Sequence, residues 1–228
     1  MVRDPARTYP HRLCLILAGA AESGLGNHDR ALERLQAAID AMDRQKVMLD
    51  WYWRLQLESA LTEVWLAKGD LGKARRQASH FLDAAQATAE RTWQALAWEA
   101  NARVAIAGAD VACAQRCIAR AFSTMNGGGE LPLAAWRVNA TAGELLECTG
   151  DPGSAEHHRE LSRTTILKLA GSLPAKEPLR QTFLSAAAIK NVFGGTGGEQ
   201  CFAAVQSCHR TTSTVAIIPL SSCPSMWQ

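Results

Sequence analysis

The sequence lacks both a long apolar run and a concentration of charge of one sign. No apolar stretch in its 228 residues approaches the ~20 residues that a membrane-spanning helix requires, and no run of Lys or Arg occurs. The 24 Lys and Arg nearly balance the 22 Asp and Glu, which leaves a net charge of +2. Proteins that bind nucleic-acid backbones usually carry a strongly basic patch. We therefore expect no membrane partner and no direct binding to nucleic acid.

The motifs of common enzymes and metal sites are also absent. No Gly-x-Ser-x-Gly occurs, and the glycine-rich stretch Gly194–Gly198 lacks the Lys-Ser/Thr pair of a phosphate-binding loop. Cys113 and Cys117 are one helical turn apart and His157-His158 follow later, but they lack the spacing of a structural zinc site. A hydrolase would need a nucleophile and a base that the sequence does not pair. The prediction is a protein without catalytic activity, metal or cofactor.

Cysteine usage points to a compartment. Seven cysteines, an odd number, are spaced irregularly, which is unlike the disulfide framework of a small secreted domain. Reduced thiols in a cytoplasmic protein are the simpler interpretation. Cys14, Cys113 and Cys117 are then expected to serve as small core residues.

The N-terminus has some features of a signal peptide. Arg3, Arg7 and Arg12 precede an apolar run over Leu13–Ala21 that ends in small residues. Acidic and proline residues interrupt the basic part, and the apolar run leads directly into the first of several repeated turns. We interpret residues 1–12 as an extension and Leu13–Leu25 as the first helix.

A repeated turn is the most informative feature that is present. Alanine is abundant and β-branched residues are sparse until the last segment, which favours helix over strand. Four times a glycine is followed by a polar turn and then by an alanine that opens a helix. A period in this range marks stacked helical hairpins. The four glycines are Gly26, Gly69, Gly108 and Gly150, at spacings of 43, 39 and 42 residues.

The second unit shows the pattern most clearly. Asp50 is a candidate N-cap for a helix over Trp51–Lys68, whose apolar residues recur three or four apart. Gly69 is expected to end this helix in the left-handed conformation, and Asp70 to cap the next one. After the fourth unit, one further helix from near Pro178 is expected to cover the open end of the stack.

Tryptophans allow two interpretations. Seven are present, and they could form a ligand cage or a stacking surface. Four of them fall at helical packing positions, so we expect them in the core: Trp53, Trp65, Trp93 and Trp136.

The composition changes at Gly194. Residues 194–228 contain only Glu199 and Arg210 as charged residues and show no helical period. We interpret this segment as a low-complexity tail that is disordered or not selected for folding, such as translation in a shifted frame. The domain prediction is therefore an extension over 1–12, a helical array over 13–193 and a tail over 194–228.

Residues 13–193 resemble tetratricopeptide repeats, although the spacing exceeds that family's usual period of about 34. The stretch Leu173–Leu184 is similar to the end of the C-terminal helical arrays of large bacterial signalling ATPases and transcriptional activators. The resemblance implies an all-α, right-handed solenoid of about four hairpins with a capping helix. Its matching residues are Gly19, Gly26, Ala31, Leu35 and Ala38; Leu61, Gly69, Ala74 and Phe81; Asp110, Ala114 and Ala121; and Gly143, Gly150 and Ala155.

The resemblance also implies a function and a site. In that family the first helix of each hairpin lines a concave groove that binds a peptide or a partner domain. Two alternatives stay open: the groove takes a small-molecule effector, or its charged residues are only a solvated face. Transfer of the groove by spacing from each turn selects Gln56, Ser59, Glu63, Glu99, Arg103, Arg137, Glu144 and Glu147.

Overall fold

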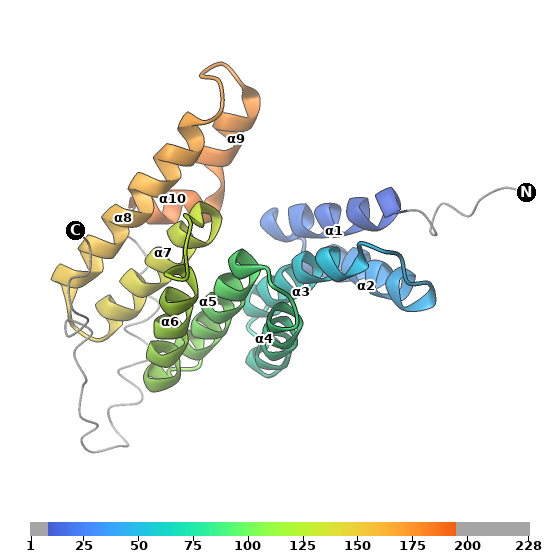
Figure 1. Ribbon diagram of the computed structural model, residues 1–228, viewed down its shortest axis with the longest axis horizontal. Helices are drawn as coiled ribbons and strands as arrows, with labels where there is room; N and C mark the ends of the chain where they lie inside the picture. Colours follow the sequence, from blue (N-terminus) through green and yellow to red (C-terminus); the bar gives the residue numbers. More distant parts are fainter. Residues whose placement is uncertain (1–8, 195–228) are drawn as a thin grey trace, which may run out of the picture.

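The computed structural model describes residues 9–194, and within them every regular element is a helix (Figure 1). The all-α prediction is therefore confirmed for this part of the chain. Gly194 ends the last helix, and the rest of the predicted tail lies outside the described residues. The helices are α1 (Tyr9–Gly24), α2 (His28–Arg44), α3 (Asp50–Ala67), α4 (Leu71–Gln86), α5 (Arg91–Ala107), α6 (Val111–Met125), α7 (Pro132–Cys148), α8 (Pro152–Gly171), α9 (Pro178–Ser185) and α10 (Ala187–Gly194).

The first eight helices form four hairpins that stack in sequence order. α1 packs on α2, α3 on α4, α5 on α6 and α7 on α8. The first helices of successive hairpins also contact one another, so that α5 touches α3 and α7 as well as α4 and α6. The first helices therefore form a continuous inner row along the stack.

The two kinds of helix bury their side chains differently. α4 buries Ala74, Ala78, Phe81 and Ala85, which lie on one face. α5 instead buries nine residues around most of its circumference, because helices surround it on several sides. Most of the buried polar side chains also come from first helices, among them Glu58, Thr62, Glu99, Asn139 and Thr141.

The hairpin turns share one hydrogen-bonding pattern. After α3, the Gly69 amide donates to the Leu66 carbonyl at 3.0 Å, and the Asp70 amide donates to the Trp65 carbonyl at 3.1 Å. This pair of bonds is the Schellman motif, which places one residue in the left-handed conformation. Gly69 takes that position with a φ of 71°, as predicted. The same pair of hydrogen bonds, at the same sequence spacing, recurs in the turns at Gly26, Ala109 and Gly150.

The third turn departs from the predicted alignment by one residue. The left-handed residue is Ala109, with a φ of 55°, whereas Gly108 has a φ of −89°. Glycine is preferred at such positions because a Cβ crowds the backbone there, but the conformation costs other residues only about 1–2 kcal/mol. The repeat is therefore counted from Gly26, Gly69, Ala109 and Gly150, at spacings of 43, 40 and 41 residues.

Aspartates cap three of the second helices. Asp70, Asp110 and Asp151 each accept a hydrogen bond at 3.0 Å from the amide three residues later. Such a bond satisfies one of the amides that a helix N-terminus leaves without an intrahelical partner. The predicted cap at Asp70 is confirmed, and it recurs at two of the three equivalent positions.

The first helix begins earlier than expected. α1 starts at Tyr9, four residues before the predicted start at Leu13. Arg12, which the sequence placed in an extension, lies inside α1 and is only 1% exposed. An interior position for this basic residue requires partners elsewhere in the fold.

Arg12 finds these partners on two other helices. Its guanidinium donates to the Asp50 carboxylate, to the Ala41 carbonyl at 2.8 Å and to the Gln45 carbonyl at 2.6 Å. The last two acceptors lie at the end of α2, where carbonyls lack intrahelical partners. We call these four groups the Arg12 clamp. The Arg12 guanidinium and the Val47 amide both donate to Oδ2 of Asp50, whereas Oδ1 is buried and accepts no hydrogen bond from any described residue. The N-cap of α3 is Leu49, and the predicted cap at Asp50 is wrong by one residue.

The C-terminal helix is broken in two. The single helix predicted from Pro178 is interrupted at Ala186, whose ψ of 137° is extended. α10 therefore turns back toward α8, and Ile189 and Val192 pack with Ile166 in one buried cluster. The break places α10 against α8, with Trp136 and Ala140 of α7 packed beside the same cluster.

The four tryptophans expected in the core lie at its edges. Each is half-buried and packs against one of the buried clusters: Trp53, Trp65, Trp93 and Trp136. The prediction is right about their location but not about their depth. A half-buried ring leaves part of its surface available to whatever lies beside it.

Candidate functional site

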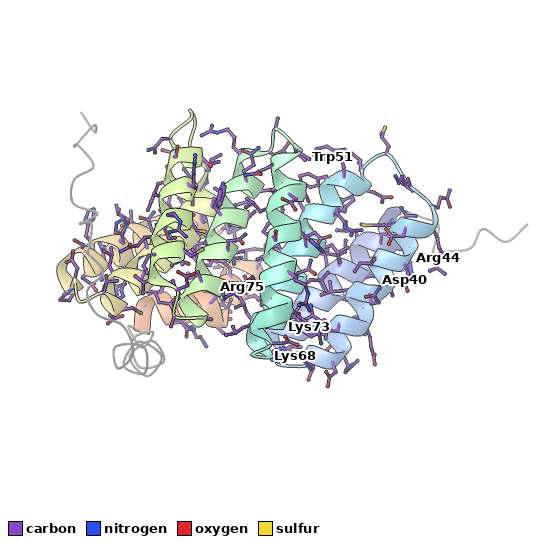
Figure 2. The ribbon with its side chains drawn as sticks, turned by 90° about the horizontal axis from the view of Figure 1, so that it is seen from below. Asp40, Arg44, Trp51, Lys68, Lys73 and Arg75 are labelled. Carbon is purple, nitrogen blue, oxygen red and sulfur yellow. The ribbon has the colours of Figure 1, made fainter. Side chains whose placement is uncertain are left out.

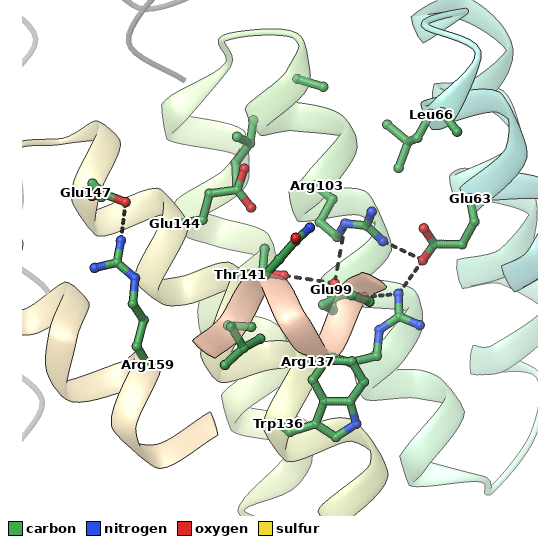
Figure 3. A pocket seen from close by; sticks show the side chains of 17 residues that line it. Glu63, Leu66, Glu99, Arg103, Trp136, Arg137, Thr141, Glu144, Glu147 and Arg159 are labelled. Atoms are coloured by element: carbon green, nitrogen blue, oxygen red, sulfur yellow. Dashed lines mark hydrogen bonds and ion pairs between the residues drawn. The ribbon is translucent and has the colours of Figure 1, made fainter. Parts of the chain in front are cut away.

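A pocket of about 710 Å³ lies against the inner row of helices. α3, α5 and α7 form most of its wall, and α8 and α10 complete it (Figure 3). Part of the lining is apolar, including Leu66, Ile106, Trp136 and Val192. The rest carries charge of both signs: Glu63, Glu99, Glu144 and Glu147 with Arg103, Arg137 and Arg159.

A charge network joins the three inner helices across the pocket (Figure 3). Glu63 of α3 accepts hydrogen bonds from Arg103 at 2.5 Å and from Arg137. Glu99 of α5 is 1% exposed, and its Oε2 lies 3.2 Å from Nη2 of Arg137. The Thr141 hydroxyl donates to Oε1 of Glu99 at 2.9 Å, whereas Oε2 accepts no hydrogen bond. These five residues, which we call the charge network, fix α3, α5 and α7 to one another.

The ion pairs of the network favour the charged forms of Glu63, Arg103 and Arg137. Burial acts to raise the pKa of Glu63, but the charges of Arg103 and Arg137 and their hydrogen bonds outweigh it and lower that pKa from 4.5 to about 2. In return, the charge of Glu63 raises the pKa of Arg103, against the opposing effect of burial. At neutral pH Glu63 and Arg103 are therefore fixed charges in the pocket wall.

The second cluster of charge in the pocket is less complete. Arg159 of α8 donates to the Glu147 carboxylate, whereas Glu144 has neither an ion pair nor a hydrogen bond with any described residue (Figure 3). Burial raises the pKa of Glu144; the charge of Arg103 opposes this, and that of Glu99 adds to it. Glu144 is thus the one carboxylate of the pocket lining that the described fold leaves without a partner.

Most of the predicted site residues come together here. The structure brings six of the eight into the pocket lining: Glu63, Glu99, Arg103, Arg137, Glu144 and Glu147. Gln56 and Ser59 lie outside it, two turns and one turn before Glu63 on α3, and both are half-buried. That these residues bind a partner stays a prediction.

Three parts of the pocket were not predicted from the sequence. Thr141 lies four residues after Arg137, a spacing that puts both on one helix face and that could have revealed it. Arg159 lies on a second helix, and the transfer from the resembled family took first helices only. α10 enters the pocket because of the break at Ala186, and no sequence signal marks that break.

A second hollow, of about 380 Å³, lies at the far end of α3. Its lining is mainly Trp51, Arg54 and alanines of the α4–α5 turn. Figure 2 shows Trp51 at one end of the α3–α4 hairpin and Lys68 and Lys73 at the other. Arg54 already pairs with Glu58 at 2.5 Å, so no free charged group converges on this hollow.

Within the part of the chain that the structure describes, the neighbouring Cys113 and Cys117 do not form a reactive centre. Cys117 is buried beside half-buried Cys113, and burial followed by the effect of Cys113 raises the pKa of Cys117 to about 12. A thiol of this pKa stays protonated at neutral pH and is a poor nucleophile. Cys14 is exposed, contrary to the expectation of a core position. Within residues 9–194 no three His, Cys, Asp or Glu side chains are grouped as around a metal ion.

Two further observations bear on function. Among the helices of the described segment, none has the length and apolar character needed to cross a membrane. The chain matches no known family model, no curated protein and no solved structure. Its function therefore has to be inferred from the pocket and from the side chains that line it.

Proposed function

We propose that this chain is a protein-interaction module of tetratricopeptide-like hairpins that holds a segment of a partner protein in the pocket. One observation carries the proposal: the charged wall of the pocket is assembled from α3, α5 and α7 together, so no single hairpin could form it. Function in stacked hairpins usually lies in such shared surfaces. The resemblance of Leu173–Leu184 to the end of bacterial helical arrays extends the proposal to a part or a relative of a bacterial regulatory protein.

Preorganisation gives the pocket its affinity. The ion pairs from Glu63 and Glu99 lock three helices in position before any partner arrives. A rigid site loses little conformational entropy on binding, so most of the ordering cost falls on the partner segment. Apolar side chains beside the charges supply the contact area that charges alone cannot provide.

Site-specific crosslinking tests this proposal. Ala107 lines the rim of the pocket and is exposed, so a photoreactive residue there should leave the fold intact. Ala119 is an exposed alanine on α6 that lines neither of the two hollows, and it serves as the matched control. We expect one partner segment to be captured from Ala107 and not from Ala119 in an extract of the cells that make the protein. Equal adducts at both positions, or none, would contradict the proposal.

A second candidate function is the sensing of a small molecule. The volume of about 710 Å³ falls in the range of about 300–1,000 Å³ that is usual for small-ligand sites. A ligand that binds the folded state raises the melting temperature without any protein partner. The replacement Ala107→Trp narrows the rim and should abolish that rise, whereas Ala119→Trp should preserve it.

A further inference from the structure

The charges of the pocket do not cancel. Four carboxylates face three guanidinium groups in its lining, and the described segment of α10 adds only uncharged residues to it. Each arginine already contacts a carboxylate: Arg103 and Arg137 contact Glu63, and Arg159 contacts Glu147. An anionic ligand would have to separate one of these pairs, whereas a cation would find a carboxylate without one.

One carboxylate in the pocket has no partner among the described residues that such a cation would have to displace. Glu144 is half-buried and makes no ion pair or hydrogen bond with any described residue. Glu99 adds negative charge behind the pocket wall, but its Oε2 is buried and already lies 3.2 Å from Nη2 of Arg137, so Glu144 is the carboxylate that a ligand can reach. A buried carboxylate oxygen without a donor loses free energy relative to water, so a donor that enters the pocket is stabilised there.

The walls beside these acceptors define the rest of the ligand. Trp136 is half-buried and lines the pocket. Leu66, Ile106 and Val192 are apolar residues of the same lining. An aliphatic stem can pack on such side chains while its charged head reaches a carboxylate. A cation beside an indole ring gains further attraction from the ring electrons.

We infer that the pocket selects an ammonium or guanidinium group on a short aliphatic stem, as in a Lys or Arg side chain of the partner segment, and that Glu144 is its counter-ion. This inference rests on the proposed function in one respect, namely that the pocket is the binding site. The inference adds that the ligand group is positively charged and that Glu144 binds it. The expected partner segment is therefore basic.

Titration of the full chain with small probes tests the inference. The first probe is Nα-acetyl-lysine amide, and the second is Nα-acetyl-norleucine amide, which has an aliphatic side chain of similar length without the charge. The readout is the indole N–H signal of Trp136 in an NMR spectrum, assigned with Trp136→Phe. We expect saturable shifts with the lysine probe and binding at least about tenfold weaker with the norleucine probe.

Matched variants identify the counter-ion. Glu144→Gln removes the charge with little change of shape and should weaken the lysine probe by about tenfold or more. Glu33→Gln, at an exposed carboxylate on α2, should change nothing. Unchanged affinity in Glu144→Gln, or no saturable shift with the lysine probe, would overturn the inference.

The outcomes also separate this inference from the proposed function. Equal affinity for the lysine and norleucine probes, or a preference for n-butyrate over n-butylammonium, would show that the pocket does not select a cation. The crosslinking result at Ala107 would still test whether the pocket binds a protein partner. Tighter binding of free n-butylammonium than of the lysine probe would uphold the cation and assign it to a small amine. If no partner segment is crosslinked at Ala107 but the lysine probe binds, the cation site is upheld and the proposed protein-binding function is contradicted.

Discussion

Two clusters of charge lie along the inner row of helices and share α3, and they differ in what surrounds them. The Arg12 clamp joins α1, α2 and α3, and its residues line neither of the two hollows described above. The charge network of Glu63, Glu99, Arg103, Arg137 and Thr141 joins α3, α5 and α7 beside a pocket of about 710 Å³. Both clusters hold helices together, but only the second one presents charge to open space.

The difference shows how to distinguish structural charge from charge that can bind. In the Arg12 clamp, main-chain carbonyls at the end of α2 supplement one carboxylate, so the partners of the arginine belong to the fold. In the pocket, the arginines pair with other carboxylates, and Glu144 has no ion-pair partner among the described residues. A carboxylate left over beside a cavity reduces stability and remains available to a ligand.

The largest effect is expected when the Arg12 clamp is broken. Arg12→Leu removes a buried guanidinium, which leaves the Ala41 carbonyl without this donor in a buried place and takes one donor from the Asp50 carboxylate and one from the Gln45 carbonyl. Removal of one partner of a buried pair typically costs about 3–5 kcal/mol. We expect that loss in the free energy of unfolding measured by urea titration. Arg30→Leu, at an arginine whose side chain is 63% exposed, should change it by less than about 0.5 kcal/mol.

A smaller effect is expected in the charge network. Glu99→Gln removes a buried charge but leaves Glu63 to hold both Arg103 and Arg137. The amide oxygen can still accept from Thr141, so we expect a loss of about 2 kcal/mol in the free energy of unfolding. The comparison with Arg12→Leu is direct, since both are read from urea midpoints. A loss as large as that of Arg12→Leu would mean that the pocket wall is as tightly sealed as the clamp.

How much of this the sequence could predict depends on the range of the interaction. The turn at Gly69 and the cap at Asp70 follow from residues that are adjacent in the chain, and both are confirmed. The third turn was misplaced because glycine is a preference at the left-handed position and Ala109 bears the cost. Arg12 was placed outside the fold because its partners lie 29 to 38 residues away.

The same limit applies to the pocket. Helical spacing from each turn found six lining residues, since one face of each inner helix repeats along the chain. It could not show that Arg103 and Arg137 both turn to Glu63, because that depends on how three helices stack. It also could not exclude Gln56 and Ser59, since the pocket ends before their part of α3.

Acid should weaken the charge network because Glu63 takes up a proton. The main-chain carbonyls of the Arg12 clamp do not titrate in the same pH range. The pKa of Glu63 is about 2 in the folded protein and 4.5 in the unfolded chain, so its contribution is complete above pH 4.5 and is lost as the pH falls toward 2. Allowing for solvent screening, we expect about 1–2 kcal/mol of stability in this window. Unfolding of the parent and of Glu63→Gln, compared between pH 5 and pH 2.5, should show a smaller pH dependence in the variant. Parallel curves would contradict this account.

The smallest effect is also the one with the opposite sign. Glu144 and Glu147 lie one turn apart on α7, and both line the pocket, but only Glu147 has a described ion-pair partner, Arg159. Burial raises the pKa of Glu144, so the folded protein binds a proton at this carboxyl more tightly than the unfolded chain does. The free energy of unfolding therefore falls as the pH rises from 4.5 through the raised pKa.

Glu144→Gln should therefore stabilise the protein at neutral pH, by up to about 1 kcal/mol. Glu147→Gln should destabilise it, because Arg159 would then lose its strongest partner in the pocket. Melting temperatures at pH 7 and at pH 4.5 provide the measurement, and the gain from Glu144→Gln should shrink at the lower pH. If both variants destabilise the protein equally, Glu144 acts as a structural group like those of the Arg12 clamp. Stabilisation combined with weaker binding of the lysine probe would instead mark Glu144 as a residue kept for a ligand at the expense of the fold.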